Sequence, residues 1–539
     1  AASDVYKRQS TRRGDAAMSG GFRSRSKVAA QRKSAQQHSA QQQQPAQRHT
    51  DTVKNTQVKH DDKASSRHHQ QHAHRRRGQA IEDAARETAL AVIRAVRADG
   101  AYANIALSQE LRHRHLNKQD AAFATELANG TVRAQGILDP VIEEAAHRPV
   151  SEIDGDLLDI LRLGTYQLLR TRVPQHAAVS TSTELARAER GQGSTGFVNA
   201  VLRTISRSTP TEWEERCCPQ EERDPVGALA YHTAHPRWIV EAFAGALHVG
   251  EDSPELAATL EADDTRPIVH LVALPGEATA MEVTAMTGGE TGPLSPYAVH
   301  LTEGGDPGRL DVVREGHARV QDEGSQIVAL TLRKAPLEGE DQGRWLDLCA
   351  GPGGKSALLG AEAAITGATV TAVEPSHHRA DLVRKACSDL PVTVVEADGR
   401  DPQIDPGFDR VLVDAPCSGL GSLRRRPESR WTRQPSDLAD LTVLQHELLT
   451  SAAQLVRPGG VIAYSTCSPH LRETEAVVRD VAIETGLDIL DATQIWPDWA
   501  GEDSVYHLTS APFIQLWPHR HGTDAMFVAL LRRPSHESL

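Results

Sequence analysis

The chain of 539 residues is 39% hydrophobic and 24% charged, an ordinary composition for a protein that buries a sizeable core in several domains. It contains no run of about 18 apolar residues, which argues against a membrane span. Its six cysteines form no CxxC pair. We therefore expect a cytoplasmic protein with reduced thiols, without a metal site or a disulfide framework.

The net charge of −13 is unevenly distributed. Residues 1–80 contain 17 Lys and Arg against 5 Asp and Glu, so the remainder of the chain is strongly acidic. Runs such as QQQQ and RHHQQHAH, without apolar periodicity, predict that residues 1–80 form a disordered basic tail. An acidic body is a poor general binder of polyanions, so binding to nucleic acid requires a local positive surface.

An all-α domain is predicted over residues 81–208. In its first helix Ala85, Leu90, Ile93 and Val96 fall near one face at helical spacing. Strand signals are nearly absent, which favours a purely helical domain. Further helices are expected at 118–135, 137–146, 156–169, 177–190 and 196–205.

Two segments with a weaker pattern follow. Residues 209–227 contain prolines and many charges and are predicted to be a linker in which Cys217 and Cys218 are inert. Residues 228–335 contain short β-like runs, such as IVHLVAL and YAVHL, between turns rich in Gly and Pro. This second segment is interpreted as a small mixed α/β subdomain.

Residues 336–535 alternate strand and helix patterns. The expected strands are RWLDLC, ATVTAVE, VTVVE, DRVLVDA, GVIAYST and MFVALLRR, with helices at 355–365, 377–389, 435–455 and 472–484. This alternation predicts a doubly wound, mostly parallel sheet of the Rossmann-like α/β class. Ligands of such sheets bind at the carboxyl ends of the strands.

A glycine-rich loop follows the first of these strands and opens a helix. It consists of Cys349, Ala350, Gly351, Pro352, Gly353, Gly354 and Lys355. The glycines allow the backbone to approach a ligand closely. The orders GxGxxG and GxxxxGK[ST] are both absent, which argues against a dinucleotide fingerprint and a Walker loop.

The next two strands end in acidic residues. Glu374 can accept hydrogen bonds from two ribose hydroxyls, and Asp398 can accept one from an adenine amino group. Either acid alone could be a solvated strand end. Glycines and acids at three consecutive strand ends together indicate an adenosyl ligand.

The fourth and fifth strands end in cysteine-containing turns, DAPCSG and YSTCS. The turns carry Asp414, Cys417 and Cys467, and neighbouring strand ends would bring the two thiols to one rim of the sheet. A thiolate that adds to C6 of cytosine makes C5 nucleophilic enough to take a methyl group, and a second thiol can assist release. Asp414 is close enough in sequence to contact the base or the thiol.

The runs DLCAGPGGKS, DAPCSGLGSLRRRPESRW and YSTCS resemble the NOL1/NOP2/Sun family of RNA cytosine-C5 methyltransferases. The bacterial small-subunit rRNA methyltransferase B (Sun/Fmu) group is the most similar branch. The segments RLGTYQLL, VPQHAAVSTSTELAR and GFVNAVLR resemble the NusB-like RNA-binding domain of that branch, and VQDEGSQIVA resembles its entry into the catalytic domain.

The resemblance implies a cofactor and a role for each site residue. S-adenosyl-L-methionine is the implied cofactor, held by the loop from Cys349 to Lys355 together with Glu374, Asp398 and Asp414. Cys467 is implied as the nucleophile and Cys417 as the residue that helps product release. The residues alone leave this choice open, since DNA cytosine methyltransferases attack with the cysteine of a Pro-Cys motif.

One departure from the family lies in the glycine loop. Gly351 stands where many relatives carry Ala. Because glycine is a conservative replacement in a crowded loop, we expect cofactor binding to survive.

A basic cluster directly follows the Cys417 loop. It comprises Arg424, Arg425, Arg426, Arg430 and Trp431. Arginines suit phosphate recognition and the indole can stack or pack, so the cluster is predicted to bind RNA rather than to be a solvated loop.

The implied partner is RNA, namely 16S rRNA before subunit assembly is complete, with the protein acting as a monomer. The alternatives are a tRNA cytosine-C5 methyltransferase and a non-catalytic RNA-binding factor for ribosome assembly.

Overall fold

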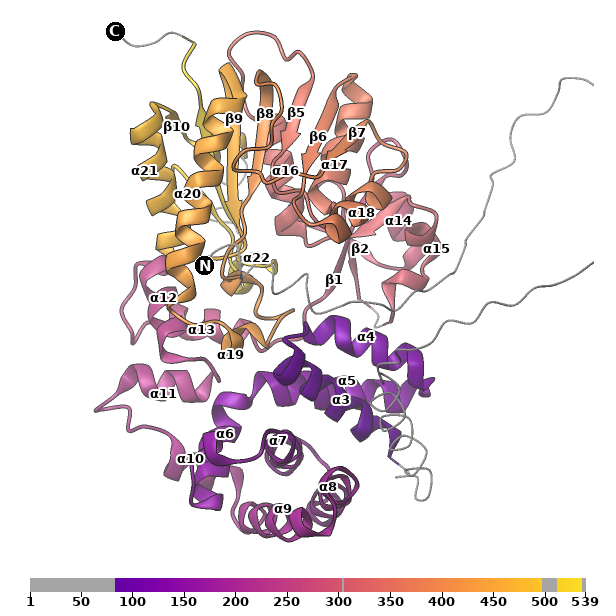
Figure 1. Cartoon of the computed structure of the whole chain (residues 1–539), viewed down its shortest axis with the longest axis vertical. Helices are drawn as coiled ribbons and strands as arrows, with labels where there is room; N and C mark the ends of the chain where they lie inside the picture. The colour runs from indigo at the N-terminus through magenta and orange to yellow at the C-terminus, as the bar shows by residue number, and fades with distance from the viewer. Residues whose placement is uncertain (1–82, 303–304, 497–510, 536–539) are drawn as a thin grey trace, which may run out of the picture. The chain divides into compact units, whose positions relative to one another are not determined.

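The computed structural model describes residues 83–302, 305–496 and 511–535 (Figure 1). The predicted tail over residues 1–80 lies outside the described residues. Among the helices that are described, none combines the length and the hydrophobicity needed to cross a membrane.

The N-terminal part is helical, as predicted. Its α-helices are α3 (Ala84–Asp99), α4 (Ala103–Arg114), α5 (Lys118–Arg133), α6 (Gln135–Ala146), α7 (Gly155–Arg170), α8 (Gln175–Arg190) and α9 (Gln192–Ile205). The sequence pattern missed α4, because only Ala103, Ala106 and Leu107 of this helix are buried and its apolar stripe is too narrow to stand out.

The predicted linker contains a helix, α10 (Pro210–Cys217). Its start is a capping box, in which Thr209 and Glu212 each accept a backbone N–H of the other. Trp213 is buried and donates its indole N–H to the carbonyl of Ile205 at 2.9 Å. Residues 209–217 are therefore packed against the helical domain rather than extended.

Three more helices and a small antiparallel sheet follow. The helices are α11 (Pro225–His232), α12 (Arg237–Leu247) and α13 (Pro254–Ala262). The sheet has the order β2 (Glu290–Thr291), β3 (Ala298–Leu301), β1 (Val269–Ala273) and β4 (Ala318–Val320), with α14 (Ala280–Thr287) and α15 (Asp311–Arg314) beside it. Its core is apolar and includes Leu271, Val283 and Val299.

The C-terminal part is built on a larger sheet with the strand order β7-β6-β5-β8-β9-β12-β10. The strands are β5 (Arg344–Asp347), β6 (Thr369–Val373), β7 (Val392–Val395), β8 (Phe408–Asp414), β9 (Val456–Thr466), β10 (Asp488–Leu490) and β12 (Phe527–Arg532), and β11 (Ile514–Gln515) pairs with β12. β5 to β9 pair in parallel, whereas β12 is antiparallel to β9. The predicted doubly wound fold is confirmed, and the order reverses between β5 and β8.

Helices cover both faces of this sheet (Figure 1). They are α16 (Glu323–Lys334), α17 (Gly354–Thr366), α18 (His377–Ala386), α20 (Asp437–Leu455) and α21 (Glu475–Thr485). Leu412 of β8 joins the core that contains α16 and α17, whereas Val411 and Val413 join the core that contains α20 and α21. Side chains alternate between the faces of a strand, so a strand that is covered on both sides places apolar residues on both faces, as Val411, Leu412 and Val413 do.

A buried carboxylate joins the small sheet to the large one. Glu323, at the start of α16, accepts the backbone N–H groups of Leu294 and Ser295, each at 2.7 Å. Its other oxygen lies 2.7 Å from Nε2 of His300, which stacks on His270 of the adjacent strand. Glu323 thus supplies the acceptor for two buried backbone N–H groups in the loop before β3.

Glu323→Ala should destabilise the protein, because it leaves two buried N–H groups without acceptors. We expect a loss of roughly 2–5 kcal/mol in the free energy of unfolding. Urea denaturation followed by circular dichroism measures it. Glu315→Ala, at an exposed site of the same subdomain, is the control and should change stability by less than about 0.5 kcal/mol. Equal stability of the two variants would show that the Glu323 contacts contribute nothing.

Candidate active site

The two predicted cysteines meet at the carboxyl ends of neighbouring strands. Cys417 follows β8 and Cys467 follows β9, and these strands pair in parallel with Asp414 opposite Ser465. The two sulfur atoms lie 3.4 Å apart. Both thiols are free and partly buried, so they can share one proton.

The surroundings of the two thiols differ in charge. A hydrogen bond from Cys417 lowers the pKa of Cys467, and the cations Arg426 and Lys355 lower it further, against the effect of burial. The same hydrogen bond, burial and the nearby carboxylate of Glu473 raise the pKa of Cys417. A thiolate is the reactive form of cysteine, so the pair is polarised towards a thiolate on Cys467.

Lys355 and Asp414 form an ion pair beside the thiols. Lys355 Nζ lies 2.8 Å from Asp414 Oδ2, and Ser465 donates its hydroxyl to Asp414 Oδ1 at 3.0 Å. Burial acts against the ammonium, but Asp414 raises the pKa of Lys355 overall. The structure thus directs Lys355, a member of the predicted cofactor loop, towards the predicted catalytic acid.

The glycine loop lies against the acid at the end of β6. Gly351 donates its backbone N–H to Glu374 Oε2 at 3.1 Å, and Gly353 precedes α17 with a φ of 108°. A Cβ at Gly351 would lie 2.2 Å from Glu374 Oε2 and 2.7 Å from Arg379 Nε. Glu374 and Arg379, the latter not singled out by the sequence, therefore occupy the space that an alanine methyl group would need.

Both predicted adenosyl contacts have oxygens suited to accepting hydrogen bonds. Glu374 is fully buried, with one oxygen also accepting from the backbone N–H of Ser376 at 2.9 Å. Asp398 follows β7 and pairs with Arg400, which lowers its pKa and keeps it ionised. A carboxylate has about four acceptor positions, so Glu374 retains capacity for hydroxyl donors. Both oxygens of Asp398 already accept from the backbone N–H and the guanidinium of Arg400, so an adenine amino group would share them with Arg400. The residues fit an adenosyl group bound across the ends of β5, β6 and β7.

Glu473 is a site residue that the sequence analysis missed. It is fully buried and accepts hydrogen bonds from the Cys417 loop and the Cys467 loop. The donors are the backbone N–H and hydroxyl of Ser418, the hydroxyl of Ser468 and the side-chain amide of Gln445. The only signal in the sequence is a glutamate six residues after Cys467, which by itself has no chemical meaning.

Most of the predicted RNA-binding cluster is engaged within the protein. Arg424 donates to the carbonyl of Gly522 at 3.0 Å, and Arg425 pairs with Asp322 and Asp524. Arg430 is fully buried and pairs with Asp264 at 2.8 Å. Trp431 donates its indole N–H to the carbonyl of Val132 at 2.8 Å, which ties the segment to the helical domain.

Arg426 is the exposed arginine of this cluster. Its guanidinium lies 4.9 Å from the ring centroid of Tyr102, next to α4. Among the residues that the structure describes, no carboxylate lies within ion-pair distance of it. RNA binding by the cluster stays a prediction, and Arg426 is the member whose charge is available for it.

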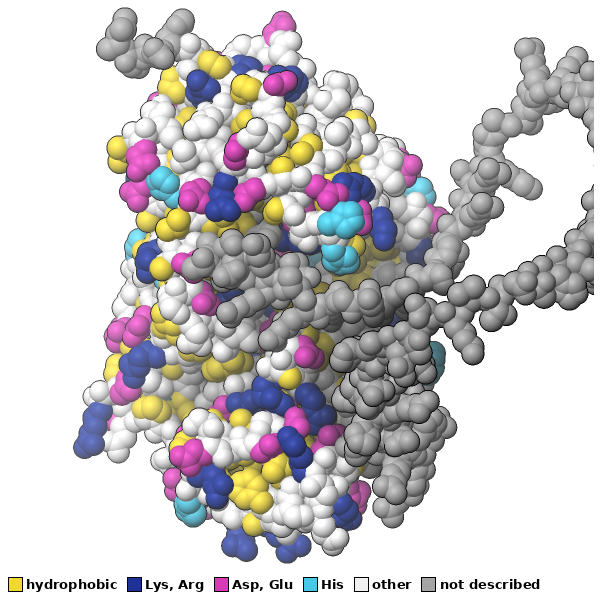
Figure 2. Space-filling view, viewed as in Figure 1, with side chains coloured by type: hydrophobic (Ala, Val, Ile, Leu, Met, Phe, Trp, Pro, Cys, Tyr) yellow, Lys and Arg dark blue, Asp and Glu magenta, His cyan; other side chains and the backbone are white. Residues whose placement is uncertain are grey.

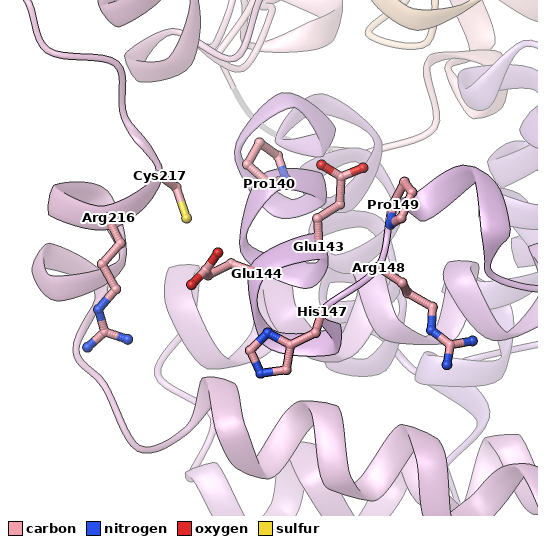
Figure 3. Close-up of a pocket in the computed structure, with 8 residues that line it drawn as sticks. All are labelled: Pro140, Glu143, Glu144, His147, Arg148, Pro149, Arg216 and Cys217. Carbon is pink, nitrogen blue, oxygen red and sulfur yellow. The ribbon is translucent and has the colours of Figure 1, made fainter.

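Basic and acidic side chains are interspersed among the described residues on the face shown in Figure 2. A pocket in the helical part lies between the end of α6 and α10 (Figure 3). Its lining residues are Pro140, Glu143, Glu144, His147, Arg148, Pro149, Arg216 and Cys217, none of them a predicted site residue. The two cysteines, Asp414 and Glu473 lie instead at the rim of the large sheet.

One cluster of possible metal ligands occurs among the described residues. Side-chain donor atoms of His270, His300 and Glu323 lie within 4.8 Å of one another. Both oxygens of Glu323 already have hydrogen-bond partners within the protein. We interpret the cluster as the structural network that joins the two sheets.

Comparisons with known proteins identify the families that the two parts of the chain resemble. Residues 334–532 match the family described as 16S rRNA methyltransferase RsmB/F, and residues 83–207 match the NusB family. A protein of Mycobacterium tuberculosis named as a methyltransferase is 55% identical over 451 residues, covering 84% of this chain and 97% of that protein.

Two further matches extend the comparison. The ribosomal RNA small subunit methyltransferase B of Pseudomonas putida is 31% identical, covering 73% of this chain and 90% of that protein. The crystal structure of PH0851 has the same fold, with a TM-score of 0.69 at 22% identity over 84% of this chain and all of that one. The chain therefore belongs to the 16S rRNA methyltransferase RsmB/F family and carries a NusB-family domain ahead of its methyltransferase domain.

Proposed function

We propose that this protein transfers a methyl group from S-adenosyl-L-methionine to C5 of a cytosine in 16S rRNA. The observation that carries the proposal is the pair of thiols 3.4 Å apart, beside the Lys355–Asp414 ion pair. A methyltransferase that acts on a nitrogen or an oxygen needs no thiol that adds to the base. The 16S substrate is supported by the names of the relatives.

The proposed reaction begins with the Cys467 thiolate, which forms a bond to C6 of the cytosine. The electron pair of the C5–C6 double bond forms a C4–C5 double bond, and the C4–N3 pair moves to N3, which takes a proton. The resulting enamine is nucleophilic at C5. Lys355 and Asp414 are the acid–base pair next to this thiol. After methylation, loss of the C5 proton re-forms the double bond, N3 returns its proton and the Cys467 thiolate is expelled, with Cys417 assisting this release.

The cofactor residues of the proposal are the glycine loop, Glu374 and Asp398. S-adenosyl-L-methionine, when bound, supplies an electrophilic methyl group. Glu374 would hold the ribose hydroxyls and Asp398 the adenine amino group, since both are carboxyl side chains that follow adjacent strands and can accept hydrogen bonds. The Arg400 pair holds the Asp398 carboxylate in place, with Nη2 to Oδ2 at 2.6 Å.

The first test separates the two thiols. Cys417→Ala should still attack and methylate but release slowly, so a protein–RNA complex should survive denaturing electrophoresis with a 16S rRNA transcript. Cys467→Ala should form no such complex and should have no activity, because it lacks the attacking thiolate. An adduct from Cys467→Ala alone would reverse the two roles. Intact methylation without an adduct in both variants would rule out covalent catalysis.

The second test concerns the adenine contact. Asp398→Ala should weaken S-adenosyl-L-methionine binding about 10-fold, since a lost hydrogen bond of roughly 1–3 kcal/mol corresponds to one or two decades in Kd. Isothermal titration calorimetry measures it. Asp401→Ala, an exposed acid of the same loop, should bind as the wild type does. Equal affinity of both variants would remove Asp398 from the cofactor site.

The third test concerns RNA. Arg426→Ala should weaken binding of the 16S transcript and reduce the slope of log K against log salt by about 1, as expected for one lost phosphate contact. Filter binding at several salt concentrations gives the slope. Arg309→Ala, whose side chain is 83% exposed on the small subdomain, is the control. A slope unchanged by Arg426→Ala would leave the cluster with a purely structural role.

A further inference from the structure

Glu473 joins the two cysteine loops through a single buried carboxylate. Its Oε1 accepts the backbone N–H of Ser418 at 2.7 Å and the amide of Gln445 at 3.1 Å. Its Oε2 accepts the hydroxyls of Ser418 and Ser468, and these two hydroxyls lie 3.0 Å apart. Since Ser418 and Ser468 directly follow the two cysteines, the carboxylate holds both turns in one arrangement.

The backbone of Glu473 adds to this connection. Its carbonyl accepts the hydroxyl of Tyr464, a fully buried residue near the end of β9. The carbonyl of Cys467 in turn accepts the N–H of Gly421 at 2.9 Å. The separation of the two sulfur atoms is therefore set by contacts on both sides of the pair.

A buried negative charge also acts on the thiols. The hydrogen bond with Cys467 and burial raise the pKa of Cys417, and the nearby carboxylate of Glu473 raises it further. The other charged groups that act on Cys467 are Arg426 and Lys355, which favour its thiolate, and Asp414, which opposes it. Negative charge thus lies on the Cys417 side of the pair and a net positive charge on the Cys467 side.

We propose that Glu473 is a positioning residue that locks the two cysteine loops together and confines the single negative charge of the thiol pair to Cys467. The proposal rests on the proposed function, in which Cys467 is the nucleophile. It explains how two thiols in contact keep different roles. A like charge nearby disfavours ionisation of Cys417, and opposite charges favour that of Cys467.

Glu473→Gln tests the charge with little change in shape. The amide carbonyl can still accept from the Ser418 N–H and from Gln445, while the amide NH₂ can donate to the Ser418 and Ser468 hydroxyls, which rotate to accept. Removal of the carboxylate charge should move the shared charge towards Cys417. The measurement is the rate of iodoacetamide alkylation of each cysteine in the full chain, resolved by mass spectrometry of the peptides.

The expected result is a rise of about 10-fold in the ratio of Cys417 to Cys467 alkylation at neutral pH, which corresponds to about one pKa unit. A merely structural loosening would speed alkylation of both cysteines and leave the ratio unchanged. Ser468→Ala is the matched variant that removes a hydrogen bond but keeps the charge, and its ratio should stay at the wild-type value. Glu475→Gln, at the start of α21, controls for loss of a carboxylate elsewhere.

A second variant tests the positive charge that acts on Cys467. Arg426→Ala removes a cation near Cys467 and should raise the same ratio, even if Glu473→Gln does not fold. An unchanged ratio in either folded variant would overturn the proposal. Alkylation needs no RNA, so this outcome is separate from a failure of the proposed function, which the absence of methylated cytosine would reveal.

Discussion

The parallel pairing of β8 with β9 is the constraint on which the site depends. In-register pairing places Asp414 opposite Ser465, so the turns after both strands leave the sheet at the same height. Each turn then needs only a few residues to bring its cysteine to the rim. Glu473, from the segment that precedes α21, joins the two turns by accepting hydrogen bonds from Ser418 and Ser468. A shift of one residue in this register would send side chains to the opposite face and separate the thiols.

Electrostatics then distinguishes two chemically identical side chains. Both thiols are partly buried, where charges act strongly because little water screens them. The contrast between Glu473 on one side and Arg426 with Lys355 on the other depends on three elements that are distant in sequence. The same neighbourhood contains Asp347, whose pKa burial raises to about 6, and its carboxylate accepts a hydrogen bond from Ser356 at 2.6 Å.

The arginine-rich segment shows that one sequence motif can combine two physical roles. Arg424, Arg425 and Arg430 hold the segment to surrounding elements, and burial of a guanidinium requires such partners. Arg426, in the same segment, remains exposed over the ring of Tyr102, and its charge lowers the pKa of Cys467. A cluster of identical residues thus contains a scaffold and a charge available to a ligand. Composition cannot separate these roles, because it does not show which arginines form ion pairs with carboxylates in the folded protein.

The sequence by itself determined the helical domain, the doubly wound sheet and the identity of the two cysteine turns. These features follow from local periodicity and from motifs at strand ends, which depend on residues close together along the chain. Weakly patterned elements such as α4 and α10 were missed, because their stability comes from packing and capping rather than from a broad apolar stripe. Tertiary structure alone decided that Lys355 pairs with Asp414 and that Glu374 and Arg379 occupy the space beside Gly351. It also decided that three arginines bind partners within the protein and that Glu473 bridges the cysteine loops. The physical reason is that hydrogen bonds and charge effects between such groups depend on distances in space, which are set only when the strands pair and the helices pack.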